Sequence, residues 1–576
     1  MNVTINNLNV EAQPGQTILD VAKENDIHIP TLCHLNLHDT KVVNQVATCR
    51  VCMVEIEGRR NLMPACSTRV SDGMVIKTNT PRAVKSRRTI VELLLSNHPK
   101  DCLVCERNQN CELQALAAEL GVRDVEYKGK RSRHDKDTSS YSLIRDPEKC
   151  VLCRRCETMC NKVQTVGVYS AVHRGFDTVM GTAFDEPILD TVCTFCGQCV
   201  SVCPTGALTQ VDNTSEVWKA INDPDKFVIV QTAPAVRVAL GEEFGVEAGT
   251  SVTGKMVAAL KLMGFDKVCD TDFAADLTIM EEATEFIDRL KNGGKLPILT
   301  SCCPAWVKFI EHQFPDLLDI PSTCKSPHEM FGAIAKTYLA EKLDIDPKKI
   351  VVVSVMPCLA KKYEAIRPEL SNKEIQNVDF VITTRELARM IREAGLTFNA
   401  LDDDDFDDML GESTGASVIF GTTGGVVEAA VRTAASWLEG KDIEKFDWTE
   451  LRGLDGIRVA TVPIAGVDVK IAIAHGLGNA RKIFERIRAG EEFHIIEVMA
   501  CPGGCIGGGG QPYYLEHDTS VLRKRAEALY AEDKEKAIRL SHKNPQIIKL
   551  YEEFLGDPGG HKAHALLHTK YVRRDN

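Results

Sequence analysis

The spacing of hydrophobic and polar residues changes twice along the chain. Between residues 2 and 78, short apolar runs alternate with polar residues, as at Met53-Val-Glu-Ile-Glu, and this period of two predicts short strands. Residues 83–127 place leucines and isoleucines at helical spacing and predict helices. From about residue 211, apolar runs such as Phe227-Val-Ile-Val and Ile350-Val-Val-Val alternate with helical segments, which predicts a largely parallel α/β sheet.

These changes predict a multidomain protein of the α+β and α/β classes. A polar stretch at 128–140 is typical of a linker, and Thr17 is expected to cap a short helix in the first domain. We expect four domains, at residues 1–78, 79–127, 141–210 and 211–576.

Composition narrows the function classes. The 69 basic and 81 acidic residues give a net charge of −12, which disfavours a broad nucleic-acid-binding surface. No run of apolar residues is long enough to span a membrane, so we expect no membrane span. The first residues contain neither a basic nor an apolar leader segment, so we expect a cytoplasmic protein.

Cysteine is the informative residue type. The chain has 22 cysteines, and 15 of them precede residue 210. Cysteines this dense in a long chain without a leader indicate metal thiolates rather than disulfides. The alternative is a set of scattered buried thiols, but their regular spacing favours metal ligation.

The first candidate ligand set is a C-x2-C pair with one distant cysteine on each side. It comprises Cys33, Cys49, Cys52 and Cys66. This strand-rich unit resembles a plant-type [2Fe–2S] ferredoxin domain, although the ligand spacing differs from the usual one. Zinc also accepts four thiolates and remains an alternative.

The second set combines one histidine with three cysteines. It comprises His98, Cys102, Cys105 and Cys111. The spacing resembles the [4Fe–4S] segment with one histidine and three cysteine ligands in the large iron–sulfur subunit of respiratory complex I. A histidine ligand makes a cluster less negative and should raise its potential. The alternative for His98 is a residue at the surface end of a helix.

The third set is a C-x2-C-x2-C-x3-C run that occurs twice, at 150–160 and 193–203. In this two-cluster ferredoxin pattern the fourth cysteine of each run ligates the other cluster. One [4Fe–4S] is therefore expected on Cys150, Cys153, Cys156 and Cys203. The other is expected on Cys193, Cys196, Cys199 and Cys160. We expect the four clusters of the three sets to act in series as an electron wire.

Three further cysteine motifs lie in the α/β domain, and several of their cysteines are near predicted strand ends. They are Ser301-Cys302-Cys303-Pro304, Met356-Pro357-Cys358, and Cys501-Pro-Gly-Gly-Cys505 with its following glycines. Four well-separated thiolates could hold one further [4Fe–4S], and glycines allow the backbone to approach a bulky group closely.

These motifs resemble the three signatures of the [FeFe]-hydrogenases, and with the N-terminal modules the similarity covers essentially the whole chain. It is closest to the large clostridial-type form with four accessory clusters. The resemblance implies a β-grasp [2Fe–2S] domain, a helical [4Fe–4S] domain with the histidine ligand, a 2[4Fe–4S] domain and a two-lobed α/β domain. The last domain would hold an H-cluster, a [4Fe–4S] cube joined to a two-iron subsite with CO, cyanide and azadithiolate. The implied cube ligands are Cys303, Cys358, Cys501 and Cys505, with Cys505 bridging to the two-iron unit.

The resemblance also implies a proton route and a cofactor pocket. Cys302 would shuttle protons, and the route would continue to the surface through Glu282, Ser322, Glu285 and Arg289. Without the resemblance, Glu282 and Glu285 are interpreted as an ordinary solvated helix face. Contacts to the cyanides would come from Lys361 and from the backbone at Ala233 and Pro234. The apolar lining would be Met356, Met499 and Phe420.

The implied activity is reversible H2 oxidation and proton reduction. No dinucleotide-binding or flavin motif is found, so electrons would pass to ferredoxin or to separate NAD(P)H-oxidising flavin and iron–sulfur subunits. Maturation proteins would supply the two-iron subsite. The alternative is a non-catalytic electron-transfer or H2-sensing relative, which the thiol at Cys302 disfavours.

A few features receive no function. Gly249 to Met256 resembles a phosphate-binding loop but lacks its Ser or Thr. The C-terminal histidines, including His564 and His568, lack the glutamate of a zinc-protease motif, and we expect no zinc site there. Cys269 is interpreted as a buried thiol, and Cys324 carries at most a redox-protection hypothesis.

Overall fold

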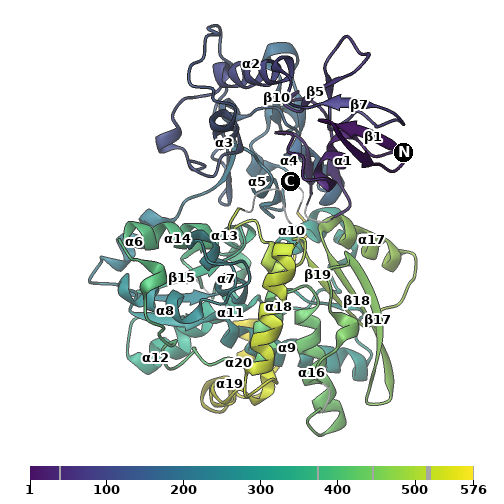
Figure 1. Cartoon of the computed structure of the whole chain (residues 1–576). Helices are drawn as coiled ribbons and strands as arrows, with labels where there is room; N and C mark the ends of the chain where they lie inside the picture. Colours follow the sequence, from purple (N-terminus) through teal and green to yellow (C-terminus); the bar gives the residue numbers. More distant parts are fainter. Residues whose placement is uncertain (38–39, 373–374, 444–445, 514–519, 575–576) are drawn as a thin grey trace.

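The computed structural model describes residues 1–37, 40–372, 375–443, 446–513 and 520–574. Figure 1 shows an upper body, built by the chain up to β11 (Leu208–Gln210), above a larger lower body. The end of the chain returns from the lower body toward the boundary between the two. The multidomain α+β and α/β class is confirmed, although the last two residues of the predicted fourth domain lie outside the described ranges.

The N-terminal unit is a five-stranded sheet with the order β2-β1-β7-β5-β6. Thr17 caps the first helix through its side chain, which accepts from Asp20 N, as expected. The apolar face of that helix packs on the sheet. The elements are β1 (Asn2–Ile5), β2 (Leu8–Glu11), α1 (Ile18–Glu24), β3 (Leu35–Asn36), β4 (Val43–Asn44), β5 (Met53–Ile56), β6 (Met63–Pro64) and β7 (Val75–Lys77).

Two helices follow, as the helical spacing predicted. The first is α2 (Pro81–Asn97), which starts with proline at its first position and Thr80 as the cap. The second is α3 (Glu112–Glu119), and the segment with Cys102 and Cys105 lies between them. Residues 128–140 contain only one isolated bridge, from Asp137 to Arg145, which fits a linker.

The cysteine-rich repeat folds as two similar halves. Each cysteine run leads into a one-turn helix, α4 (Arg155–Thr158) or α5 (Gln198–Ser201). The residue before each helix has a left-handed backbone conformation: Arg154 has φ 62° and Gly197 has φ 75°. Antiparallel pairs join the halves: β8 (Leu143–Arg145) with β11, and β9 (Ser170–Val172) with β10 (Val179–Gly181).

Two four-stranded sheets form the lower body. The first is wholly parallel, with the order β13-β12-β15-β16. The second has the order β14-β19-β18-β17 and is parallel except for the β17–β18 hairpin. The strands are β12 (Phe227–Thr232), β13 (Lys267–Asp270), β14 (Ile298–Leu299), β15 (Ile350–Met356), β16 (Phe380–Thr383), β17 (Ile457–Ile464), β18 (Val467–His475) and β19 (Ile495–Met499).

Helices cover both sheets and separate them. The long helix α9 (Thr271–Asn292) is buried over most of its length and packs against α11 and α16. The other helices of this body are α6 (Thr214–Ile221), α7 (Pro234–Arg237), α8 (Thr253–Leu262), α10 (Pro304–Gln313), α11 (Pro327–Ile334), α12 (Ala340–Leu343), α13 (Ala360–Glu364), α14 (Thr384–Glu393), α15 (Gly415–Val418), α16 (Gly425–Glu439) and α17 (Leu477–Arg488).

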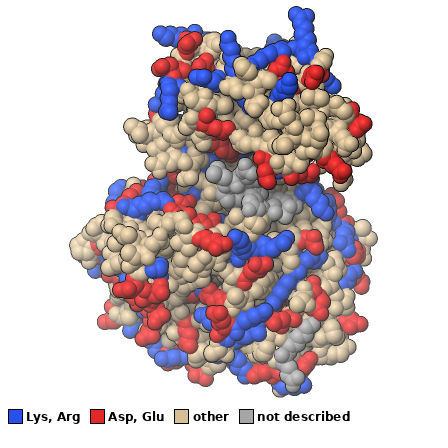
Figure 2. Space-filling model, in the orientation of Figure 1, with Lys and Arg blue, Asp and Glu red and all other residues tan. Residues whose placement is uncertain are grey.

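The C-terminal segment lies across the lower body. Its helices are α18 (Ser520–Glu535), α19 (Pro545–Leu550) and α20 (His561–Leu567). In Figure 1, α18 crosses the front of this body, and Figure 2 shows acidic and basic side chains interspersed over the same face. Across the described ranges, we find no helix that is both long and apolar enough to cross a membrane.

A buried ion network ties the C-terminal segment to α16. The Arg432 guanidinium donates to Glu428 Oε1 and Asp533 Oδ2, each over 2.8 Å, and all three side chains have no exposed surface. Arg452 and Arg539 complete the network from its edge. A cation enclosed in this way is costly to remove, because its partners keep their charge inside the protein.

We expect Arg432→Leu to lower the stability of the folded protein by about 3 kcal/mol, because two buried carboxylates lose the cation between them. Lys524→Met on α18 is the control, since its ion pair with Glu247 is exposed, and it should cost less than about 1 kcal/mol. Anaerobic thermal denaturation of the cluster-loaded protein measures both. Equal melting temperatures for the two variants would contradict a structural role for the network.

Candidate active site and ligand sets

The three C-terminal cysteine motifs meet in one cavity between the two sheets. Cys302 and Cys303 follow β14, Cys358 follows β15, and Cys501 follows β19, each at the carboxyl end of its strand. The carboxyl ends of parallel strands are where α/β proteins place their sites. The cavity has about 710 Å³ free of protein atoms, and all five motif cysteines, including Cys505, line it.

The surroundings of these thiols disfavour their charged, deprotonated form. Burial raises the pKa of Cys358 to about 12 and raises those of Cys303, Cys501 and Cys505, with further repulsion among the sulfurs. All 22 cysteines are free of disulfides. Four convergent thiols with these pKa values fit a metal cluster, since bound cations displace the thiol protons and compensate the charge.

The glycine-rich loop around Cys505 also fits a site for a bulky metal cluster. Gly504 has φ +93°, and a Cβ there would lie 2.7 Å from Thr423 N. A Cβ at Gly508 would lie 2.0 Å from Pro357 O, beside Cys358. Only glycine allows this loop to press against the neighbouring cysteine loop, so the loop shapes one wall of the cavity.

The remaining walls are mostly apolar. Every residue expected in the pocket lines the cavity: Ala233, Pro234, Met356, Lys361, Phe420 and Met499. Lys361 Nζ donates to Cys302 O over 3.0 Å and to Glu364 Oε2 over 2.7 Å. His328 Nε2 also lies 2.7 Å from that oxygen. The sequence analysis missed Glu364, although its position three residues after Lys361 on α13 was a usable signal.

Glu282 lies inside the protein behind Cys302. Its side chain is buried, and Oε1 accepts from Ser301 N over 3.1 Å and from Ser301 Oγ over 3.2 Å. The interpretation of a solvated helix face is therefore wrong for Glu282. Burial, reinforced by Glu285, raises the pKa of Glu282 to about 7. Burial and the nearby Glu282 likewise raise the pKa of Cys302.

The other expected proton-route residues are adjacent. Ser322 Oγ donates to Glu285 Oε2 over 2.9 Å and lies near enough to Glu282 to affect its pKa. Arg289 pairs with Glu285 and donates to Ile320 O and Pro321 O. The structure thus places Glu282, Glu285 and Arg289 of α9 beside Cys302, which follows β14, and Ser322, which lies in the segment before α11. We call this row of side chains the proton file.

The first accessory set is also brought together. Cys33, Cys49, Cys52 and Cys66 are all buried. The sulfur of Cys33 is in hydrogen-bond contact with those of Cys49 and Cys66, and Cys52 is in contact with Cys66. These contacts raise the pKa values of Cys49 and Cys66. The geometry suits a small four-thiolate cluster, and zinc fits the same donors.

The second set lies at the surface of the upper body. His98 is the residue that ends α2, as the alternative interpretation held, but its ring is partly buried. Its Nε2 atom is buried and has no hydrogen-bond partner within the described chain, while Nδ1 contacts Pro99 O at 2.7 Å. An unpartnered buried nitrogen fits a metal ligand. Cys102 is exposed, and Cys105 and Cys111 are half-buried.

The repeated runs cross over as the ferredoxin pattern predicts. One cavity is lined by Cys150, Cys153 and Cys156 together with Cys203 from the other run. A second is lined by Cys193, Cys196 and Cys199 together with Cys160. Each cavity therefore collects three thiols from one run and the fourth from the other.

Both N-terminal sets lie close to the Cys150 cavity. Asn44 Nδ2 donates both to Cys33 O over 2.6 Å and to Cys153 O over 3.0 Å, which joins the first set to the Cys150 cavity. Gly206, next to that cavity, approaches the second set, since a Cβ there would lie 2.7 Å from Cys105 Sγ. Both N-terminal sets therefore contact the Cys150 cavity, and the order in which the clusters would pass electrons stays a prediction.

The Cys193 cavity in turn borders the central one. A Cβ on Gly509 would lie 2.8 Å from Gly197 Cα and 2.9 Å from Cys196 O. The sulfur of Cys196 is also near enough to Cys501 to raise its pKa. The upper body thus contacts the lower one at the loop that carries Cys501 and Cys505.

Family models match every part of this organisation. Residues 226–509 match the iron only hydrogenase large subunit, C-terminal domain, and 519–574 match the iron hydrogenase small subunit. Upstream, 1–81 match a 2Fe-2S iron-sulfur cluster binding domain and 149–207 a 4Fe-4S dicluster domain. Residues 87–126 match the NADH-ubiquinone oxidoreductase-G iron-sulfur binding region.

Similar proteins include two that match end to end. NADP-reducing hydrogenase subunit HndD of Solidesulfovibrio fructosivorans is 58% identical, over 100% of this chain and 99% of that protein. Iron hydrogenase 1 of Clostridium pasteurianum is 40% identical, over 99% and 100%. Cytosolic iron-sulfur assembly component 3 of Mus musculus is 31% identical, over 66% and 82%. Among solved structures, a variant of [FeFe]-hydrogenase HydA1 from Chlamydomonas reinhardtii superposes with a TM-score of 0.58 at 39% identity, covering 63% of this chain and 99% of that one.

The raised pKa of Glu282 predicts a pH-dependent stability difference. The pKa rises from 4.5 to about 7 on folding, so the protonated carboxyl favours the folded state at low pH, and this contribution is lost as pH rises toward 7. Because glutamine keeps the shape without titrating, Glu282→Gln should be more stable than wild type at pH 8, by up to ~3 kcal/mol, and nearly equal to it at pH 5. Thermal denaturation at both pH values measures the gap, with Glu439→Gln at the exposed end of α16 as control. A gap that does not grow with pH would contradict the assignment.

Proposed function

The chain belongs to the iron-only hydrogenase family, and from this membership we propose which of its residues hold the clusters, carry electrons and move protons. It is an [FeFe]-hydrogenase with accessory iron–sulfur clusters, and it interconverts H2 with protons and electrons. The observation that carries the residue assignments is the central cavity, where five cysteines from three strand ends meet beside a buried carboxyl.

We propose that Cys303, Cys358, Cys501 and Cys505 hold the [4Fe–4S] cube of the H-cluster, with Cys505 bridging to the two-iron subsite. When bound, this group supplies the redox chemistry on hydrogen. The chain contributes an apolar, water-excluding wall from Met356, Met499 and Phe420. Lys361 faces the cavity as the donor for a cyanide ligand. Ala233 and Pro234, which the resemblance also implied, line the wall beside it but do not donate there, because the Ala233 N–H donates to Val355 O and proline has no N–H.

The accessory clusters follow from the three other ligand sets. We propose one [2Fe–2S] on Cys33, Cys49, Cys52 and Cys66, and three [4Fe–4S], of which one uses His98. The contacts through Asn44 and Gly206 support two electron entry points that merge at the Cys150 cluster. The Cys193 ligand set would hold the cluster that adjoins the central cavity, because Gly509 touches Gly197 there. The corresponding domain limits are 1–78, 79–127, 141–210 and 211–576.

Protons take a separate file in this proposal. The Cys302 thiol, which is not a cube ligand, exchanges a proton with Glu282, whose pKa of about 7 suits transfer in both directions near neutral pH. Glu282 Oε2 is buried with no hydrogen-bond partner in the described part of the chain, so it is free to accept. Ser322 Oγ then connects Glu282 to Glu285.

For the electron partner, we infer a complex with NAD(P)-linked flavin and iron–sulfur subunits, with ferredoxin as the alternative donor or acceptor. The support is the 58% identity to a protein named as a subunit of an NADP-reducing hydrogenase, which matches the chain over its whole length. Maturation proteins would deliver the two-iron subsite. The cytoplasm remains the proposed compartment, because it keeps thiols this numerous reduced.

The experiment that tests these roles compares two neighbouring groups of cysteines. Cys302→Ala should retain all roughly 20 iron atoms expected from one [2Fe–2S], three [4Fe–4S] and the six-iron H-cluster. Its turnover should fall at least about 100-fold in both directions, because only the innermost proton donor is lost. Cys505→Ala should instead lose the two-iron unit. Iron analysis and H2 assays of matured proteins measure both.

Either of two results would overturn the assignment of Cys302. One is near wild-type turnover in Cys302→Ala with full iron content. The other is a loss of iron in Cys302→Ala as large as in Cys505→Ala, since that would make Cys302 a ligand rather than a proton donor.

A further inference from the structure

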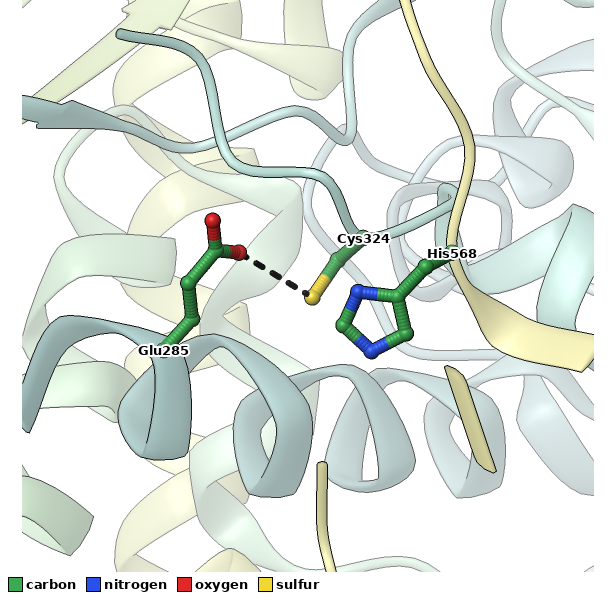
Figure 3. A group of neighbouring side chains, drawn as sticks. All are labelled: Glu285, Cys324 and His568. Atoms are coloured by element: carbon green, nitrogen blue, oxygen red, sulfur yellow. Dashed lines mark hydrogen bonds between the residues drawn. The ribbon is translucent and has the colours of Figure 1, made fainter. Parts of the chain in front are cut away.

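Beyond Glu285, the proton file meets a residue of the C-terminal tail. Figure 3 shows three neighbouring side chains: Glu285 on α9, Cys324, and His568 from the C-terminal tail. Cys324 Sγ lies 3.9 Å from Glu285 Oε2. His568 follows α20 and pairs through its backbone with Cys324. The tail therefore completes the outer end of the file.

Arg289, the other neighbour of Glu285, is not suited to pass a proton. Its guanidinium carries only N–H donors and has no acceptor atom. It is also fixed by Glu285 and by the carbonyls of Ile320 and Pro321. Arg289 positions Glu285, so the group that takes the proton onward must be another one.

Thr323 connects Glu285 to His568. Its Oγ1 lies 3.3 Å from Glu285 Oε2 and 2.7 Å from His568 Nδ1. A hydroxyl can donate to one neighbour while it accepts from the other, so its proton can point either way. Thr323 N also donates to Glu285 Oε2 over 3.0 Å, which holds the carboxyl in place.

Glu281 sets which nitrogen of His568 is available. His568 Nε2 lies 2.8 Å from Glu281 Oε2. Glu281 is buried and also accepts from Tyr551 Oη and Gly559 N. A carboxylate so placed keeps the proton on Nε2, which leaves Nδ1 facing Thr323 as the atom that can gain or lose one.

His568 is near solvent through His564, which lies one turn earlier in the chain, on α20. The His568 side chain is 5% exposed. Its ring stacks on that of His564, with centroids 4.5 Å apart and planes within 8°. His564 is exposed, so solvent has access to this pair of imidazoles.

The same atoms could be interpreted as a metal site. One ligand atom each of Glu285, Cys324 and His568 lies within 4.8 Å of the others. Both nitrogens of His568 and both oxygens of Glu285 already have hydrogen-bond partners, however. A metal would have to break those bonds, whereas a proton relay uses them as they stand.

We propose that His568 is the proton-relay residue that links Glu285 to solvent, through the hydroxyl of Thr323. This proposal rests on the proposed function of the Cys302 to Glu285 file. During H2 oxidation, protonated Glu285 gives its proton to Thr323 Oγ1, and Thr323 gives its own to Nδ1 of neutral His568. The products are the Glu285 carboxylate and an imidazolium, which turns one N–H away from Thr323 to release its proton to solvent beside His564. Proton reduction runs the same steps backward.

The first test is His568→Gln, assayed in both directions as a function of pH and in D2O. We expect turnover at least about tenfold lower, with a changed pH profile and a larger solvent isotope effect, because proton exit becomes limiting. His542→Gln is a matched control. His542 also contacts a threonine hydroxyl and a carboxylate, Thr433 and Asp442, but lies outside the file. Its turnover should be that of wild type.

A second pair of variants separates relay from structure. In His568→Ala, added imidazole should restore turnover, because a diffusible base can occupy the vacated place next to exposed His564. Thr323→Val should lose turnover as His568→Gln does, but imidazole should not restore it, since the broken link lies inside. The double variant Thr323→Val with His568→Gln should be no slower than either single one.

The outcomes decide between the claims. Wild-type turnover and isotope effect in His568→Gln would overturn the relay. So would the absence of imidazole rescue in a His568→Ala protein that retains its iron and melting temperature. If Cys302→Ala is also fully active, the proposed file itself fails. If Cys302→Ala is inactive while His568→Gln is active, only the exit through His568 is wrong.

Discussion

The structure depends on the cost of placing thiolate charge inside a protein. Four thiols that line one cavity converge near the carboxyl ends of strands in two sheets, and loss of hydration raises their pKa values, with mutual repulsion adding to the effect at Cys358 and Cys505. Such a site is favourable only when bound cations replace the thiol protons. The wholly parallel sheet, the second sheet and the glycine loop against Pro357 place those sulfurs together, and the rest of the molecule serves that centre.

An enclosed redox centre requires separate routes for electrons and protons. In the proposed function, electrons cross between the two bodies where Gly509 meets Gly197 next to Cys196. In the proposed function, protons use the row of titratable side chains on α9, because the cavity wall is largely apolar. The C-terminal segment, which matches a model named for a small subunit, supplies His568 at the end of that file. A segment outside the two sheets thus completes the site.

Features that depend on local spacing in the chain could be predicted from the sequence. Cysteine runs, the cap at Thr17 and the strand-end positions of the motifs all follow from local patterns, and the structure places them as expected. Contacts between residues distant in the chain were not predictable in this way. His568 was set aside because it lacked a zinc motif, yet it lies against Thr323. The spacing of Glu282 and Glu285 alone favoured a solvated helix face, and only the resemblance to [FeFe]-hydrogenases placed Glu282 on a proton route, which its burial fits. The contact that Asn44 makes with both Cys33 O and Cys153 O was missed for the same reason.

Infrared spectroscopy of the matured wild-type protein tests the central claim most directly, because metal-bound CO and cyanide absorb where protein does not. We predict sharp CO and cyanide bands that shift when the protein is reduced with H2 and that are absent from protein produced without maturation proteins. A matured protein with full accessory clusters but no such bands would contradict the claim that the five-cysteine cavity holds a two-iron centre.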